Sequence, residues 1–251
     1  MDADTIARVA LENQVLRGVV GSTVHGTAVD GQDDRDEMGV FVEPREYVCG
    51  LEPIDHYVYR DQPDGVRSEA GDLDLVLYSL RKFCRLATRG NPTVLLLLWV
   101  PSPLLATPIG RDLIAMREEF ISQESGRRFV GYLRAQLMRL TGERARTVVR
   151  PDLVEKYGYD TKFAMHALRL GLQGIELLSD GRLTLPVREP DLTLLREVRT
   201  GVVHYEEAVR LIRESEAKLL AVVDEFTKLV DEGAINAFMV RAHQEHWSGR
   251  K

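Results

Sequence analysis

Residues 21–26 (GSTVHG) and 34–42 (DRDEMGVFV) form the stretch that decides the fold. A Gly-Ser turn is followed by two carboxylates, Asp34 and Asp36, at the start of an apolar run. Side chains alternate between the two faces of a β-strand, so a strand that begins here should carry both aspartates on one face. Two such carboxylates repel each other unless a cation neutralises them, and Mg²⁺ or Mn²⁺ prefers oxygen ligands of this kind. The stretch therefore predicts a divalent metal site at the start of a strand.

The Gly-Ser turn predicts a phosphate contact beside this metal. Gly21 permits a close approach, Ser22 offers a hydroxyl, and both can present backbone N–H groups to a phosphate. A metal next to a phosphate indicates phosphoryl transfer. The alternative is a solvated acidic loop over residues 30–37 that leads into an edge strand. A D-x-D pattern alone fits either interpretation, and the upstream glycines favour the site.

A third carboxylate is expected in a later strand. Residues 72–78 (DLDLVLY) alternate polar and apolar side chains, which predicts a strand with Asp72, Asp74 and Val76 on one face. Phosphoryl transfer with metal ions needs a further ligand or base that helps to place the attacking hydroxyl. The spacing alone leaves three options open: Asp72, Asp74, or two solvent-exposed aspartates at a strand edge.

These residues resemble the signature of a known superfamily. The pattern G-S-x-x-x-G, followed by a D-x-D and an apolar strand, is similar to that of the DNA polymerase beta-like nucleotidyltransferases. Residues 78–83 (YSLRKF), 89–92 (RGNP) and 158–166 (GYDTKFAMH) resemble the branch associated with RNA repair ligases (RlaP-like). The resemblance runs from about residue 19 to about residue 185. It implies an α/β (α+β) fold: a small mixed sheet with helices, followed by a C-terminal helical domain.

The resemblance also implies a reaction. It is the metal-dependent transfer of NMP from an NTP to an acceptor hydroxyl or phosphate, with release of pyrophosphate. Asp34, Asp36 and Asp74 would be both the catalytic residues and the ligands of Mg²⁺ (or Mn²⁺). The implied domains are residues 1–108, which are catalytic, and 109–251, which are helical and close the nucleotide site. Asp33 stands where the family usually has a small hydroxyl residue, which leaves the metal stoichiometry open.

The acceptor implied by the resemblance is an RNA end, in a repair pathway. Two alternatives remain open. The same chemistry could act on a protein or small-molecule acceptor, or the chain could be a catalytically inactive nucleotide-binding partner of a ligase.

A helix after Gly158 supplies the nucleotide-binding candidates of the second half. Asp160 should cap it and Gly181 should end it. Its polar stripe consists of Lys162, His166, Arg169 and Gln173. Lysine and arginine neutralise triphosphate charge during phosphoryl transfer, and His166 would orient phosphate or base. With Gly21 and Ser22, the predicted nucleotide-binding residues are Lys162, His166 and Arg169. An ordinary hydrogen-bonded histidine is the alternative for His166.

Two basic groups are candidates for binding the acceptor. Ser79 should cap a helix whose stripe of Lys82, Arg85 and Arg89 either binds polyphosphate or acceptor, or is simply a solvated face. Further along, Arg144 and Arg146 concentrate positive charge between the two halves, together with Arg127, Arg128, Arg134, Arg139 and Arg150. That group is either an acceptor site or a salt-bridged linker.

Composition limits the remaining functions. The net charge of −6 disfavours a general basic surface for long nucleic acids. Cys49 and Cys84 have no disulfide or zinc spacing, so we expect reducing cytoplasm. The longest apolar run, residues 94–100, is far below the roughly 20 residues of a membrane span.

Helical spacing predicts a first helix from about residue 4 to 17, before a short strand at 18–21 and another at 38–42. A long amphipathic helix over residues 204–231 is either structural or part of a homodimer interface. His243 and His246 are a weak metal-ligand candidate, because no carboxylate or thiol pattern surrounds them.

Overall fold

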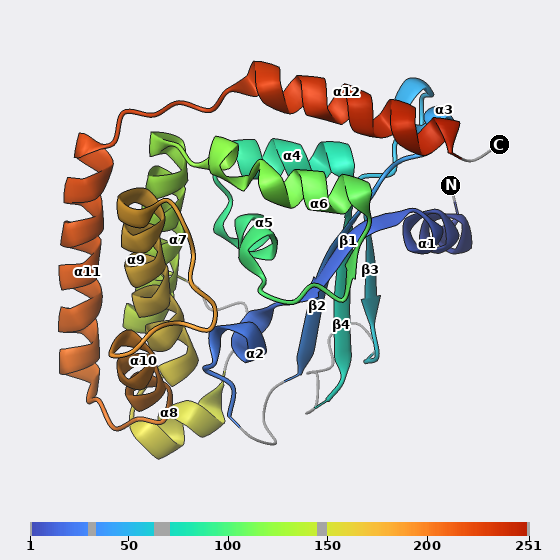
Figure 1. Cartoon of the computed structure of the whole chain (residues 1–251). Coiled ribbons are helices and arrows are strands. Elements are labelled where there is room, and N and C mark those ends of the chain that lie inside the picture. Colours follow the sequence, from blue (N-terminus) through green and yellow to red (C-terminus); the bar gives the residue numbers. More distant parts are fainter. Residues whose placement is uncertain (1, 30–33, 63–70, 145–149, 250–251) are drawn as a thin grey trace. The chain divides into compact units, whose positions relative to one another are not determined.

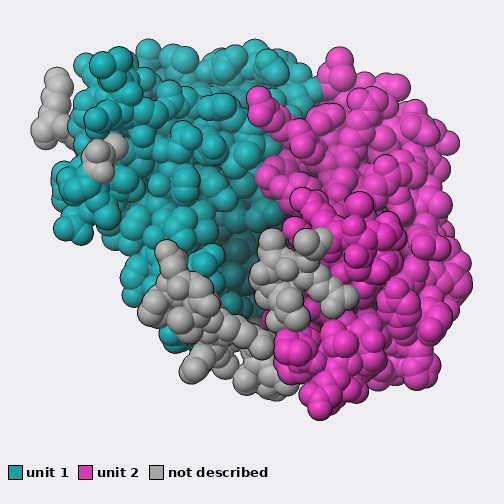
Figure 2. Space-filling view, turned by 180° about the vertical axis from the view of Figure 1, so that it is seen from behind, with its two compact units in different colours: residues 1–88, 93–120, 230–251 teal, residues 89–92, 121–229 magenta. Residues whose placement is uncertain are grey.

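The computed structural model describes residues 2–29, 34–62, 71–144 and 150–249. The chain forms two compact units (Figure 2). Unit 1 comprises residues 1–88, 93–120 and 230–251, and unit 2 comprises residues 89–92 and 121–229. These boundaries differ from the expected division at residue 108, because the chain, apart from residues 89–92, stays in unit 1 up to residue 120 and returns to it at residue 230.

The described part of unit 1 contains a five-stranded sheet in the order β3-β4-β2-β1-β5 (Figure 1). Its strands are β1 (Gln14–Val19), β2 (Arg35–Phe41), β3 (His56–Arg60), β4 (Leu73–Ser79) and β5 (Leu105–Ala106). β2 and β4 are parallel, and the other neighbours are antiparallel. This mixed sheet confirms the predicted α+β class.

Seven α-helices and two 3₁₀ helices accompany the sheet in the described residues of unit 1, counting α5, whose first residue belongs to unit 2. They are α1 (Ala3–Glu12), α2 (Gly21–His25), α3 (Arg45–Cys49), α4 (Leu80–Thr88), α5 (Pro92–Leu95), η1 (Leu96–Trp99), α6 (Pro108–Ala115), η2 (Arg117–Phe120) and α12 (Glu232–Ser248). α6 packs against β1 and β5, which is why the residues after 108 stay with the sheet.

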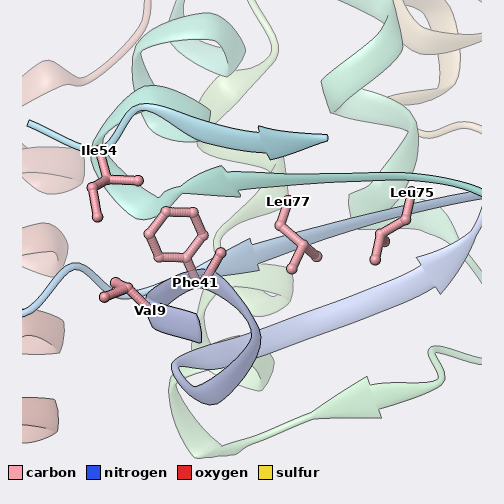
Figure 3. Close-up of a cluster of buried hydrophobic side chains, with 6 residues drawn as sticks. Val9, Phe41, Ile54, Leu75 and Leu77 are labelled. Carbon is pink, nitrogen blue, oxygen red and sulfur yellow. The ribbon is translucent and has the colours of Figure 1, made fainter. Parts of the chain in front are cut away.

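One face of the sheet packs against α1 (Figure 3). The buried side chains of this cluster are Val9, Ala10, Phe41, Ile54, Leu75 and Leu77. Since Leu75 and Leu77 point into this core, the alternate residues of β4 point to the other face. The carboxylate of Asp74 therefore lies on the face opposite α1.

The predicted first helix is too long. Asp2 caps α1 by accepting from the Thr5 N–H, and the helix ends at Glu12 instead of about residue 17. The Asn13 side chain donates to the Val9 carbonyl over 2.7 Å, and β1 begins at Gln14. Pairing with β2 and β5 gives β1 backbone partners that an isolated helical pattern cannot reveal, so the strand replaces the last turn of the predicted helix.

The described part of unit 2 is helical, with α7 (Gln123–Thr141), α8 (Pro151–Tyr157), α9 (Thr161–Asp180), α10 (Asp191–Arg199) and α11 (Tyr205–Glu225). α7, α9 and α11 lie side by side (Figure 1). Both predicted ends of α9 are confirmed. Asp160 accepts from the Phe163 N–H over 3.2 Å, and Gly181, with φ 69°, ends the helix.

The long helix predicted over residues 204–231 ends earlier than expected. α11 stops at Glu225, and α12 is a separate helix that the sequence analysis did not identify. The apolar side of α11, including Ile212, Leu219 and Val223, is buried, and α11 packs on α7 and α9. This supports the structural alternative, while a homodimer through this helix stays a prediction. None of the described helices is long and apolar enough to cross a membrane.

Candidate functional site

Three carboxylates converge in unit 1. Asp36 and Asp74 are register partners in the parallel strands β2 and β4, and Asp34 immediately precedes β2. Each of the three offers an oxygen, and these oxygens all lie within 4.8 Å of one another. All three side chains are half-buried. The strand register therefore selects Asp74, while the side chain of Asp72 accepts a hydrogen bond from Gln62 over 3.0 Å and lies outside this group of three.

An ion pair with Glu37 holds Arg35, the residue between the first two aspartates, away from them. Glu37, which is 2% exposed, accepts from Arg35 over 2.7 Å and from Arg17 over 2.5 Å. Glu37 lies on the opposite face from Asp36, since neighbouring residues of a strand alternate. The ion pair therefore fixes the Arg35 side chain on the far face and leaves Asp34 and Asp36 together on the near one. Sequence analysis missed Glu37, whose charge was indistinguishable from the acidic loop before it.

Gly21 lies directly against Asp36. Its φ is +68°, and a Cβ at this position would lie 1.9 Å from Asp36 Oδ2. The Val20 N–H also donates to the Asp36 carbonyl over 2.9 Å. Only glycine fits this approach, so the structure gives Gly21 a role in positioning Asp36.

Ser22 is the next residue, and it is half-buried in the first turn of α2. The expected Gly-Ser turn is thus the start of a five-residue helix. Gly26, with φ 76°, ends this helix. The arrangement places Ser22 next to the residue that touches Asp36.

The donor set suits a divalent cation. Three carboxylate oxygens in mutual reach are hard ligands, and their repulsion falls when an ion binds between them. Arg60 Nε lies 3.9 Å from Asp74 Oδ1, but Arg60 is 54% exposed, so this pair neutralises little of the charge. Asp33, the residue expected to bear on metal stoichiometry, lies outside the described residues.

The predicted nucleotide-binding residues of α9 form part of a basic cluster in unit 2. Arg169 donates to Gln173 Oε1 over 2.6 Å, and its Nη2 lies 3.1 Å from His166 Nε2. Burial, together with the charges of Arg169, Arg150 and Arg139, lowers the pKa of His166 to about 3. His166 is therefore neutral at physiological pH and accepts a hydrogen bond from Arg169.

Arg169 itself stays charged, because burial lowers its pKa only to about 10. Lys162 lies one turn before His166 and is half-buried. Gln173, expected on a polar stripe, is buried. Arg150 was expected to bind the acceptor or to belong to a linker. It pairs with Asp160 over 3.2 Å and lies 5.1 Å from the centre of the Phe163 ring.

The acceptor-binding candidates are spread over both units. Ser79 caps α4 as predicted, since its Oγ accepts from the Lys82 N–H over 3.2 Å. Lys82 pairs with Asp55 over 3.3 Å, while Arg85 is exposed on α4. Arg144 is exposed after α7 in unit 2, and Arg146 lies outside the described residues.

Ion pairs engage other members of the arginine group. Arg134 pairs with Glu216 over 2.5 Å, and Arg128 pairs with Glu124 over 3.2 Å. These contacts support the salt-bridged alternative for that part of the group.

The two histidines considered as metal ligands have structural partners. His243 Nε2 lies 3.2 Å from Glu43 Oε2, and His246 Nε2 lies 2.8 Å from Asn13 Oδ1. Both contacts hold α12 in unit 1. Among the described residues, the three aspartates are the one group of three or more histidine, cysteine or carboxylate side chains that could hold a metal ion.

Comparisons with known proteins gave a structural match and a family match. A crystal structure of a nucleotidyltransferase-like protein from Exiguobacterium sibiricum 255-15 matches with a TM-score of 0.31 and 11% sequence identity, covering 96% of this chain and 74% of that chain. None of the curated proteins matches the chain. The sequence model of the RNA repair pathway DNA polymerase beta family (RlaP) matches residues 3–240. Since this match spans nearly the whole sequence, the chain belongs to that family and is a nucleotidyltransferase of the DNA polymerase beta type.

Proposed function

We propose that this enzyme transfers NMP from an NTP to the end of an RNA acceptor and releases pyrophosphate, with Mg²⁺ or Mn²⁺ as its metal. The observation that carries the proposal is the convergence of Asp34, Asp36 and Asp74 from the ends of two parallel strands. The description of the family as an RNA repair family supports the choice of RNA.

The three aspartates would have different roles in the reaction. A divalent ion bound to them would neutralise the phosphate charge that develops during transfer. Asp34 and Asp36 would hold that ion, with Gly21 keeping the Asp36 carboxylate in place. Asp74 would complete the ligand set and accept the proton of the acceptor hydroxyl. The acceptor oxygen then bonds to the α-phosphorus, and the bond from that phosphorus to the pyrophosphate oxygen breaks.

Two groups of residues are proposed to bind the triphosphate. Ser22 and the Gly21 backbone would supply donors next to the aspartates, and Lys162, His166 and Arg169 of α9 are the proposed source of further charge and hydrogen bonds. Gln173 and His166 fix the Arg169 guanidinium, so little side-chain entropy is lost when it meets a phosphate. Because His166 is neutral, it orients Arg169 without adding a competing charge.

The acceptor strand would meet the exposed Arg85 and Arg144, with Lys82 and Arg146 as further candidates. Lys82 must first leave Asp55, at small cost for a part-exposed pair.

The test is pyrophosphate release from each of the four NTPs with Mg²⁺ or Mn²⁺, in the presence of total RNA. Asp36→Asn should abolish release and labelling of RNA. Asp112→Asn removes an exposed carboxylate from α6 of the same unit and should behave as the parent. Retained transfer by Asp36→Asn would refute the site. Transfer to protein or small-molecule acceptors, but not to RNA, would keep the chemistry and replace the acceptor.

A further inference from the structure

The sheet face that carries the aspartates continues beyond them toward its edge. β3 is the outer neighbour of β4 and forms one edge of the described sheet (Figure 1). Its register pairs Arg60 with Asp74, Val58 with Val76, and His56 with Tyr78. Two contacts confirm that these side chains share a face: Arg60 Nε lies 3.9 Å from Asp74 Oδ1, and the rings of His56 and Tyr78 are 6.4 Å apart.

Three rows of side chains therefore cross β2, β4 and β3 on this face. They are Asp36–Asp74–Arg60, Met38–Val76–Val58 and Val40–Tyr78–His56. Exposure rises along each row toward the edge. Met38 and Val40 are buried, Val76 and Tyr78 are half-buried, and Val58 is 45% exposed. We call the residues Arg60, Val76, Val58, Tyr78 and His56 the edge surface.

We propose that the edge surface binds the terminal nucleotides of the single-stranded RNA acceptor. This inference rests on the proposed function, because it locates the acceptor of the same reaction. The surface is continuous with the aspartates in one rigid sheet. Tyr78 lies four positions after Asp74 on β4, which is about 13 Å at the usual rise of a strand. An RNA end lying along this line would present its terminal hydroxyl at Asp74.

The chemistry of the edge surface matches an unpaired RNA strand. Tyr78 and His56 offer ring faces on which bases can stack, and Val58 and Val76 offer apolar contact between those rings and the aspartates. Arg60 provides a guanidinium for a phosphate, and that charge is available because its ion pair with Asp74 is long and exposed. A duplex end would hide its base faces in its own stack, so the surface selects single strands.

The size of this surface also fits the charge of the protein. With a net charge of −6, the chain lacks the general positive field that holds long nucleic acid. A short patch that combines one guanidinium with stacking rings needs no such field, and it would contact only the end of the strand. Arg85, the acceptor candidate exposed on α4 of the same unit, would then meet more distant phosphates.

Two variants that introduce opposite charges at Val58 test the proposal. The position is exposed on an edge strand, so both Val58→Glu and Val58→Lys should fold. The assay is transfer from a saturating NTP to a labelled single-stranded oligoribonucleotide, with KM for the RNA and for the NTP measured separately. Val58→Glu should raise the KM for RNA about tenfold and leave the KM for NTP unchanged, whereas Val58→Lys should not raise the KM for RNA.

Two further variants complete the design. His56→Ala removes one stacking ring and should also raise the KM for RNA several-fold. Tyr59→Ala is the matched control, since Tyr59 lies between Val58 and Arg60 on the opposite face and is 42% exposed. It should leave the KM for RNA unchanged.

The outcomes separate this inference from the proposed function. If the parent enzyme modifies no RNA, the proposed function is refuted, and so is the role proposed for the edge surface. A parent that modifies RNA while Val58→Glu and His56→Ala behave as the parent would overturn the edge surface alone. A change in oligomeric state in Val58→Glu, without a change in KM for RNA, would assign the edge to another protein chain and overturn the proposal as well.

Discussion

Replacement of Gly21 by alanine should displace a metal ligand without touching any charge. A Cβ at Gly21 would lie 1.9 Å from Asp36 Oδ2, 2.7 Å from its Cγ and 2.9 Å from its Cβ. Nonbonded heavy atoms do not approach this closely, so the Asp36 carboxylate must leave its place among the three aspartates. The left-handed backbone costs an alanine about 1–2 kcal/mol, and an off-rotamer Asp36 adds about 1 kcal/mol. We therefore expect a loss of about 2–3 kcal/mol of folding free energy.

The structure supplies a matched control for this variant. Gly181 has φ +69°, almost the same as Gly21 at +68°, but a Cβ there would meet nothing within 4 Å. Gly181→Ala should therefore pay the backbone cost alone, about 1–2 kcal/mol. Only Gly21→Ala should weaken Mn²⁺ binding, by at least tenfold, and abolish nucleotidyl transfer.

Both effects are measurable on the purified protein. Calorimetric titration with Mn²⁺ gives the metal affinity, and denaturant unfolding gives the free energy. A double variant, Gly21→Ala with Asp36→Ala, removes the Oδ2 and Cγ contacts but keeps the Cβ contact at 2.9 Å, so it should recover part of the clash component of the destabilisation but not the metal affinity. Parent-like Mn²⁺ affinity in Gly21→Ala, or equal weakening in Gly181→Ala, would refute the reasoning.

Three further predictions concern charges held inside the two units. Burial lowers the pKa of His243, but hydrogen bonds, led by the one with Glu43, outweigh it and leave the pKa raised. Its stabilising contribution is thus complete below about pH 6.5 and is lost as the pH rises through the raised pKa, so denaturant unfolding of His243→Gln should depend less on pH above about 6.5 than that of the parent. The pKa of His166 is lowered to about 3, so its ring should show no titration by NMR between about pH 5 and 8, and a titration there would contradict the burial argument. Glu37→Gln should cost about 1–2 kcal/mol in denaturant unfolding and slow transfer, because it removes the carboxylate that Arg17 and Arg35 share, while Arg35, which is 55% exposed, stays hydrated; unchanged turnover would show that the ion pair is not needed to keep Arg35 away from the aspartates.

Local sequence patterns predicted the parts of this protein that depend on neighbouring residues. Strand alternation placed Asp34 and Asp36 together, and the structure keeps their oxygens within 4.8 Å of each other. The two ends of α9 followed from a side-chain cap at Asp160 and a left-handed glycine at Gly181. These features depend on hydrogen bonds and dihedral angles within a few residues, so the sequence carries them directly.

Other expectations were wrong where contacts between residues far apart in the sequence determine the local structure. Residues 14–17 fit a helical spacing, but β1 forms there because β2 and β5 supply its backbone partners. The sequence analysis did not identify α12, whose attachment to unit 1 depends on contacts between His243 and Glu43 and between His246 and Asn13, which are 200 and 233 positions apart in the sequence. No local pattern marks such pairs.

The sequence by itself determined the D-x-D pair and the glycine turn before it, since each is written in adjacent residues, and the family resemblance that these residues carry implied the mixed α+β class. Only the tertiary structure decided between Asp72 and Asp74, because the parallel register of β2 and β4 sets Asp74 beside Asp36. The same packing brought Gly21 against Asp36 and buried Glu37 between two arginines. The physical reason is that a carboxylate becomes a ligand through the distance to its partners, and strand pairing, not local propensity, fixes that distance.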